Sequence, residues 1–350
     1  MTASILKPEN QTETSIKDDL RMRDILKTLP REVFEKDPRK AWFKVAVNVL
    51  MVGLGYWGLA ISPWFLLPIL WIFTGTAMTG FFVIGHDCAH RSFSNRNWVN
   101  DLVGHLAMLP LIYPFHGWRV GHDIHHKHTN KLGVDNAWEP WQPEIYDNLG
   151  SSLKWFYRRM RGRFWWLGSV AHWAVVHFTW WKFPEQEQER VRFSAIFVIL
   201  GAAIGFPILI ATTGILGFVK FWLLPWLVYH FWMSTFTIVH HTMPDIPFKT
   251  VEEWNEAEAQ LSGTVHCDYP RWVEFLCHDI NVHIPHHIST GIPWYNLRKA
   301  NQSLRENWGE YLYETKFSWS LMKQISDRCH LYDPDNCYQS FAEFRQRAVD

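Results

Sequence analysis

Three clusters of histidine residues have the spacing of a metal site. His122, His125 and His126 lie within five residues, and positions i, i+3 and i+4 share one face of a helix. The three rings could therefore point their nitrogen atoms at one place. One imidazole can act as a pH switch, but three converging imidazoles suggest a metal. The same pattern recurs near the C-terminus and a shorter i, i+4 pair lies upstream, which adds His86, His90, His283, His286 and His287.

Eight histidines are too many for one ion, since a catalytic zinc site uses three protein ligands and a structural site four. Two metals sharing eight or nine imidazoles would each keep room for an outside ligand. The pair His240 and His241 offers a ninth ligand, and either residue could equally be a polar helix end. Imidazole suits zinc, copper, iron and nickel alike, so the ligands do not select the metal.

Metal-bound imidazoles usually donate their second N–H to a carboxylate or carbonyl group. We call the three histidine clusters the first, second and third box, in chain order. Asp87, Asp123 and Asp279 lie close to them in the sequence and are candidate acceptors, although each could also be a solvated charge or a helix cap. The other histidines are interpreted as structural, with His128, next to the second box, the least certain of them: His105, His116, His128, His172, His177, His230, His266, His278 and His330.

Two apolar hairpins must bring these boxes together. Residues 41–61 and 64–85 are each long enough to cross a bilayer, which takes about 20 residues, and Ser62-Pro63 separates them. Residues 193–216 and 218–239 form a second pair. The expected fold is an all-α integral membrane protein with four transmembrane helices in two hairpins and a cytoplasmic helical cap that carries a histidine-rich dimetal site. Its expected segments are 1–40, 41–85, 86–192, 193–239 and 240–350.

The segments outside the hairpins are more polar. We expect a solvated tail at 1–11, an amphipathic helix at 14–29, and interfacial helices at 98–115 and 164–181; a third and fourth span in the last two segments is the alternative. Basic residues are concentrated before the first span and, as Arg158, Arg159, Arg161 and Arg163, in the central loop. Because basic loops stay on the cytoplasmic side, the boxes and both termini are expected there.

Composition excludes several other classes of protein. The chain has 34 basic and 34 acidic residues, so charge gives no reason to expect a nucleic-acid partner. The five cysteines show no CxxC spacing, which argues against a disulfide framework or a zinc ribbon. There is no GxGxxG or P-loop pattern, so no bound flavin or nicotinamide is expected. Electrons for any redox chemistry would come from a separate donor, which could dock on the basic cytoplasmic face.

The boxes, read as residues, resemble those of the membrane fatty acid desaturases. The sequence His86-Asp87-Cys88-Ala89-His90, followed by Arg91-Ser92-Phe93, looks like the first box of that family, and the later two boxes also match. The approach Lys27 to Glu32 and the third box are most like the Δ12 (omega-6) acyl-lipid desaturases of cyanobacteria and plastids. The resemblance extends over most of the chain from Leu29 onward.

This resemblance implies two iron ions, molecular oxygen as co-substrate, ferredoxin as electron donor and no haem. It implies that oleoyl chains of membrane glycerolipids are converted to linoleoyl chains in a cyanobacterial plasma or thylakoid membrane. The family's ligands correspond to the eight box histidines and to His241; Met243 stands where plant relatives often have another histidine, which leaves the details of this outer ligand open. Alternatives are another regiospecificity such as omega-3, a di-iron fatty acid hydroxylase or ketolase, and a metal transporter.

Overall fold

The computed structural model describes residues 20–347 of the chain. The predicted tail at 1–11, the first residues of the helix predicted at 14–29 and both chain ends lie outside these residues. Within the described part of that segment, the α-helix is the short α1 (Met22–Leu26), which is followed by the 3-10 turn η1 (Arg31–Phe34). Ile25 of α1 is fully buried, so this segment packs against the cap of the molecule.

The first predicted hairpin is formed by α2 (Pro38–Ile61), η2 (Trp64–Leu66) and α3 (Leu67–Ala89). Asp37 caps α2 by accepting hydrogen bonds from the backbone N–H groups of Arg39 and Lys40, and Pro38 occupies the first helical position, where proline is tolerated. The helix α3 continues four residues beyond the predicted boundary at 85. This extension carries His86 into the cap, and His90 ends the helix.

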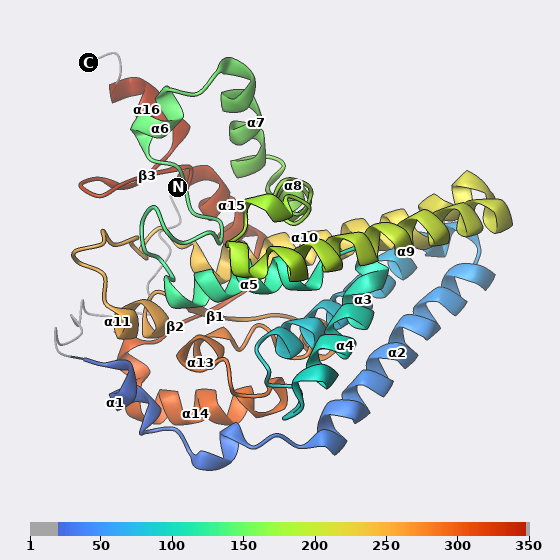
Figure 1. Ribbon diagram of the computed structural model, residues 1–350. Helices are drawn as coiled ribbons and strands as arrows, with labels where there is room; N and C mark the ends of the chain where they lie inside the picture. Colours follow the sequence, from blue (N-terminus) through green and yellow to red (C-terminus); the bar gives the residue numbers. More distant parts are fainter. Residues whose placement is uncertain (1–19, 348–350) are drawn as a thin grey trace.

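The second apolar region is one continuous helical stretch, Glu185–His241, which turns back on itself. It comprises α9 (Glu185–Phe218), the π-helical turn η6 (Val219–Leu223) and α10 (Leu224–His241). The backbone leaves helical geometry at Gly214, where φ is 72°, a value that glycine adopts without steric cost. The rings of Phe206 and Trp222 lie 4.4 Å apart on either side of this point, so the chain reverses there (Figure 1).

By length and hydropathy, three helical stretches are apolar enough to cross a membrane: Pro38–Ile61, Trp64–Ala89 and Glu185–His241. The count of four spans stays a prediction that treats the two arms of the last stretch separately. Large apolar side chains project outward from α2 and α9, including Trp57, Ile61, Ile204 and Leu216. Within the described residues 86–184, no helix has the length and hydropathy of a further span.

The cap is built from shorter helices. Its first part contains α4 (Asn97–Met108), η3 (Leu109–Leu111), α5 (Phe115–Lys127), α6 (Pro143–Asp147), α7 (Ser151–Arg161), η4 (Trp165–Leu167), α8 (Gly168–Val176) and η5 (Trp180–Lys182). Its second part contains α11 (Glu256–Leu261), α12 (Arg271–Leu276), α13 (His283–Ile288), η7 (Trp294–Asn296), α14 (Leu297–Trp308), η8 (Gly309–Tyr311), α15 (Trp319–Arg328) and α16 (Phe341–Arg347). The two predicted interfacial segments are thus short helices joined by turns.

The expectation of an all-α protein needs one correction, because the cap also contains four short strands. The strands β1 (Val265–Asp268) and β2 (Tyr313–Lys316) pair in parallel, and β3 (Leu331–Asp333) and β4 (Cys337–Gln339) pair antiparallel. Buried backbone groups outside helices need hydrogen-bond partners, and each two-stranded pair supplies them where the cap has no helix. The remainder is mostly helical.

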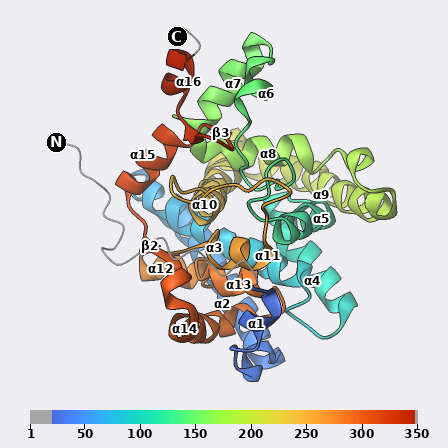
Figure 2. The same ribbon diagram turned by 90° about the vertical axis from the view of Figure 1, so that its left-hand side faces the viewer.

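The main hydrophobic core lies where α3, α4, α5 and α10 meet. Met78, Met108, Phe115 and Tyr229 are fully buried there. Figure 2 shows α3, α5, α10 and α13 close to the centre of the molecule, with the other cap helices around them. The three helices that carry the histidine boxes, and α10 with His240 and His241, therefore converge on the core. This packing fixes the positions of the histidine side chains.

Candidate metal centre

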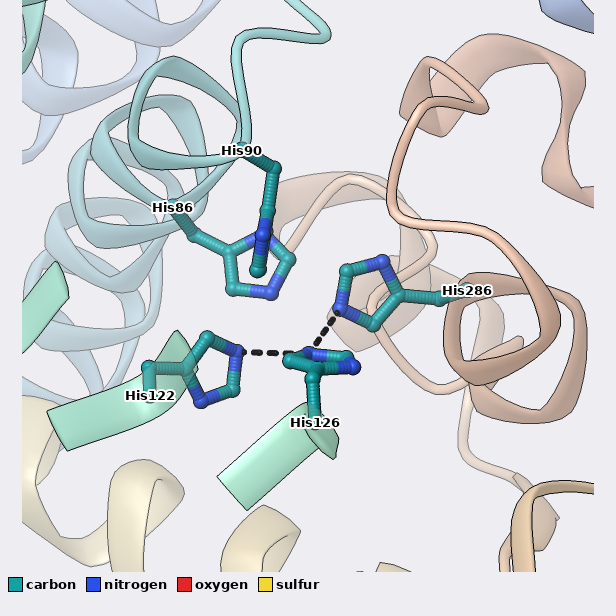
Figure 3. Close-up of side chains that lie close together, drawn as sticks. All are labelled: His86, His90, His122, His126 and His286. Atoms are coloured by element: carbon teal, nitrogen blue, oxygen red, sulfur yellow. Dashed lines mark hydrogen bonds between the residues drawn. The ribbon is translucent and has the colours of Figure 1, made fainter. Parts of the chain in front are cut away.

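Five histidines from three helices converge in what we call the five-histidine group. It consists of His86, His90, His122, His126 and His286. One ring nitrogen of each lies within 4.8 Å of those of all the others, and the Nε2 atom of His126 is 3.0 Å from both His122 Nε2 and His286 Nε2. Figure 3 shows the rings from α3, α5 and α13 pointing toward one another. This is the arrangement of imidazoles around an ion.

A second cluster, the four-histidine group, lies directly beside the first. Its members are His125, His241, His283 and His287. Nε2 of His241 is 3.2 Å from Nε2 of His125 and 2.9 Å from that of His283. The rings of His126 and His287, one from each group, stack with their centroids 4.2 Å apart. The two groups could therefore hold two metal ions as neighbours.

The second box is divided between the two groups, which corrects the idea that its three rings point at one place. His122 and His126 join the five-histidine group, whereas His125 joins the four-histidine group. All three lie on α5, as the spacing predicts. Successive residues of a helix point about 100° apart, so His125 and His126 diverge, and only the i, i+4 pair shares a direction.

The third box is also shared between the groups. His283 begins α13, and Pro285 lies in the first turn, where its missing N–H costs no helical hydrogen bond. His286 enters the five-histidine group, while His283 and His287, four residues apart, enter the other. One short helix thus supplies ligands to both centres.

Burial favours the neutral form of three of these imidazoles. The pKa values of His126, His286 and His287 lie well below the usual value for histidine, first because the rings are buried and then because other histidines surround them. A neutral imidazole has one nitrogen lone pair available to a cation. The buried Nε2 atoms of His86 and His90 have no hydrogen-bond partner among the described residues. The donor set therefore fits a pair of imidazole-bound metal ions.

Two buried carboxylates and one amide orient particular rings. Nδ1 of His86 lies 3.2 Å from Oδ1 of Asp87, whose other oxygen accepts a hydrogen bond from the backbone N–H of Trp294. Nδ1 of His125 is 2.7 Å from Oδ1 of Asp135. Each contact lets the ring donate its Nδ1–H, which leaves Nε2 free to face the metal position.

Gln260 has the same function for the third box. Its Oε1 lies 2.7 Å from Nδ1 of His287, and its Nε2 donates to the backbone oxygen of His126. The side chain is 1% exposed. Gln260 therefore connects a ligand of one group to the backbone of a ligand of the other.

The two remaining acidic candidates are less closely associated with the histidines. An oxygen of Asp123 is 4.0 Å from Nδ1 of His90 and the side chain is 40% exposed, a distance too long for a hydrogen bond. The carboxylate of Asp279 pairs instead with the guanidinium of Arg298, at 2.6 Å. Among the described residues, no hydrogen bond joins Asp279 to a box histidine.

A largely apolar cavity opens beside both groups. It encloses about 530 Å³, including some space open to solvent, and lies between α3, α5 and α10. Its walls contain Phe82, Val83, Trp118, Met233 and Phe236, with Thr79 and Thr237 as polar exceptions. Five histidines of the two groups line it, namely His86, His122, His125, His241 and His283, together with His240, which belongs to neither group. The cavity suits an apolar ligand held against the metal positions.

Comparison with protein families agrees with this geometry. The fatty acid desaturase family matches residues 61–319. The chain belongs to the fatty acid desaturase family. The match begins at the last residue of α2 and contains α3, the second apolar region and all nine histidines of the two groups.

Individual relatives are similar to this desaturase over nearly its whole length. A protein from Anabaena variabilis, named sn-1 oleoyl-lipid 12-desaturase, is 62% identical over 98% of this chain and 99% of its own. A protein of the same name from Picosynechococcus is 60% identical over 99% of this chain and all of its own. The chloroplastic omega-6 fatty acid desaturase of Spinacia oleracea is 56% identical over 93% of this chain and 72% of its own.

The structure separates the roles of His240 and His241 at the end of α10. His241 belongs to the four-histidine group, while His240 lines the cavity and stacks on His283 with ring centroids 4.3 Å apart. The nine histidines interpreted as structural lie outside both groups. His105, for example, bonds Ser194 through Nε2 at 2.8 Å, and His278 lies 3.0 Å from Oδ1 of Asn48.

Sequence reasoning missed Asp135 and Gln260. Asp135 follows the turn at Gly133 in a polar loop that also contains Glu139, so nothing local distinguishes it. Gln260 is far from any box in the sequence and has no charge. Their role depends on the way the loop after α5 and helix α11 fold back onto the histidines, which a local motif does not encode.

Proposed function

We propose that this chain is an oxygen-dependent oleoyl-lipid Δ12 desaturase that converts oleoyl to linoleoyl chains in membrane glycerolipids. The observation that carries the proposal is the placement of nine imidazoles in two adjoining groups, five of which line a largely apolar cavity. The names of the relatives from Anabaena and Picosynechococcus support the oleoyl substrate and the position.

We propose iron as the metal of both groups. Family membership favours iron, and imidazole ligands are compatible with it. Bound iron would supply the activation of molecular oxygen that removal of hydrogen from an unactivated methylene requires. The described metal groups contain histidine only. The function of the protein chain is to hold these rings through Asp87, Asp135 and Gln260, so that their lone pairs converge before a metal arrives.

The cavity would hold the acyl chain and exclude water. Phe82, Met233 and Phe236 provide an apolar surface for methylene groups, and burying each such group contributes about 0.8 kcal/mol. The same walls leave the reacting carbon facing the histidines of both groups. Because the hydroxyl of Thr79 donates to the backbone oxygen of Gly75 at 3.0 Å, this polar wall residue is already paired and does not require water.

Orientation and electron supply form part of the proposal. Four crossings would place the histidine groups and both chain ends in the cytoplasm of a cyanobacterium, at the plasma or thylakoid membrane. Ferredoxin would then deliver electrons from that side. The arginines of the central loop and the basic residues before α2 support this orientation.

The test is expression of the full chain with a ferredoxin system in cells that contain oleoyl lipids, followed by analysis of their fatty acids. The proposal expects linoleate with the new double bond at Δ12. A double bond at another position would favour omega-3 or another regiospecificity, and a product that carries an added oxygen atom would identify a hydroxylase or ketolase. If the protein is inserted and loaded with metal but oleate is unchanged, the Δ12 desaturase, a desaturase of another regiospecificity and the hydroxylase or ketolase would all be ruled out.

A metal transporter is the less favoured reading. A transport path would place polar ligands along the spans, since ionisable residues inside a membrane mark ion routes. Here both groups gather at the cap ends of α3 and α10 and on the cap helices α5 and α13. Uptake of iron by vesicles containing the protein would support transport against this expectation.

A further inference from the structure

The helix α7 carries an exposed face on which apolar and basic side chains are mixed. Leu153, Trp155 and Phe156 are exposed by 45%, 60% and 42%. Arg158 and Arg159 are exposed next to them, and the guanidinium of Arg159 lies 5.5 Å from the centre of the Trp155 ring. None of these side chains belongs to the candidate metal centre or to the cavity.

The opposite face of α7 is fixed to the body of the protein. Tyr157 and Arg161 are buried. The hydroxyl of Tyr157 donates to the backbone oxygen of His330, and Nη2 of Arg161 donates to that of Trp138, 2.8 Å away. One face of the helix is therefore held against the body of the protein, which leaves the other face exposed.

The segment that follows α7 in the chain packs against the apolar stretch Glu185–His241. The residues that follow α7 form η4 and α8, where Ser169 donates to the backbone oxygen of His230 on α10 and the hydroxyl of Ser234 donates to that of Trp166. Figure 1 shows α7 beside α8, near the cap end of α9 and α10. The outer face of α7 thus continues into the segment 164–181, which the sequence predicts to lie on the membrane interface.

Charge indicates what covers this face. Arg158, Arg159 and Arg163 take part in none of the ion pairs found within residues 20–347; each guanidinium instead lies against an aromatic ring, Arg158 on Phe341 and Arg163 on Phe164. Arginines beside exposed tryptophan and phenylalanine characterise helices that lie in the headgroup region. Basic residues near an anionic membrane surface are attracted to its headgroups.

We propose that α7 is an interfacial anchor whose aromatic side chains enter the membrane surface and whose arginines bind anionic lipid headgroups. The anchor rests on the membrane insertion proposed above, but not on the desaturase reaction. Arg161 of α7 also connects the anchor to the surroundings of the metal centre. Arg161 holds the backbone of Trp138 and Glu139, in the loop that contains the His125 partner Asp135 and the cavity residue Ala137.

The test measures the depth of a spin label in lipid nanodiscs. The variant Trp155→Cys with Cys337→Ser carries one label at position 155, and Phe156→Cys in the same background is a second probe. The native Cys337 is exposed on the hairpin β3–β4, away from the spans (Figure 1), and is the water-facing control. Leu54→Cys with Cys337→Ser, on the exposed side of α2, is the lipid-facing control.

The first measurement uses discs of phosphatidylcholine with 30% phosphatidylglycerol. Oxygen should broaden the spectral line of the label at 155 more than a water-soluble nickel complex does, and the label at position 54 should behave in the same way. Discs without phosphatidylglycerol, or the variant Arg158→Gln/Arg159→Gln/Arg163→Gln, should raise nickel accessibility at 155 severalfold.

Nickel accessibility at 155 and 156 equal to that at Cys337 would overturn the anchor, as would protection that appears only when an acidic protein is added. An immersed label indifferent to phosphatidylglycerol would overturn the headgroup contact. Loss of linoleate formation with unchanged labels would contradict the proposed function alone.

Discussion

His125 and His126 are neighbours in the chain, yet their rings enter different groups. Substitution of either one should therefore remove a different ion. We expect His125→Ala and His126→Ala each to lose activity and to lower the metal content from about two ions per chain to about one, because each empties one group and leaves the other intact. Metal analysis of the purified proteins, loaded anaerobically with Fe²⁺, measures this content.

His128→Gln is the matched control, since His128 ends the same helix but belongs to neither group. It should retain both ions. A full metal content in His125→Ala would show that His125 is not a ligand. Complete loss in both single variants would mean that the two ions bind only together.

Asp135 should matter more than Asp279, although only Asp279 was singled out from the sequence. The carboxylate of Asp135 holds the ring of His125 at 2.7 Å, while that of Asp279 pairs with Arg298. Loss of such a partner typically lowers metal affinity or activity 10- to 100-fold, an order-of-magnitude range. We expect a decrease of roughly that size in Asp135→Asn and little change in Asp279→Asn, measured by competition with a chelator. Equal behaviour of the two variants would refute the distinction.

The sequence predicts the ligands at the residue scale better than it predicts the residues that support them. A ligand box has a period that a helix imposes, so His86, His90 and His283 can be identified from local spacing. The partners have no such period. Asp135 and Gln260 reach their histidines through a loop and a separate helix, and their positions depend on tertiary packing.

Among the helices, close packing of α2 against α3 holds the first histidine box in place. A Cβ atom added at Gly80 would lie 1.9 Å from Oδ1 of Asn48 and 2.5 Å from the backbone oxygen of Leu276. The backbone oxygen cannot move aside, so Gly80→Ala should destabilise the protein by about 1–3 kcal/mol, the usual cost of overpacking. The thermal unfolding midpoint in detergent measures the change.

Gly53→Ala provides the comparison for that variant, because no atom lies within 4 Å of the added carbon. Alanine favours helix over glycine, so the midpoint should stay the same or rise. If both variants lower it equally, the loss reflects a general sensitivity of these helices and not the contact with Asn48.

The helices of the two apolar regions follow from hydropathy, and their ends follow from individual residues. Proline and serine at 62–63 locate the first turn correctly. The extension of α3 to Ala89 agrees with the i, i+4 spacing of His86 and His90, which lie just beyond the predicted span. The reversal of the second hairpin is predicted between residues 216 and 218, close to Gly214, where the structure has it. The four strands are not predicted, since segments of three or four residues give too weak a local pattern.

The two metal groups join distant parts of the whole molecule. Their ligands come from α3, α5, α10 and α13, which together span most of the chain. A ligand that binds only the folded state stabilises it by about 2.7 kcal/mol at a hundredfold excess over its dissociation constant. We therefore expect the unfolding midpoint to rise by several degrees with anaerobic Fe²⁺ and to fall again with a chelator.

The variant His125→Ala should keep only part of that gain, because one group would still bind its ion. A midpoint that does not respond to metal in the unmodified protein would contradict the idea that the ions connect these four helices.

The carboxylates beside the ligands have a consequence for charge balance. Imidazole ligands bring no negative charge, and two divalent ions would bring four positive charges into a buried site. Only Asp87 and Asp135 are buried carboxylates in contact with ligand rings among the described residues. The loaded site would therefore hold uncompensated positive charge in a region of low dielectric constant, where it is costly. Oxidation of either ion to the trivalent state would add one more positive charge, so this environment would favour the divalent form of a bound iron.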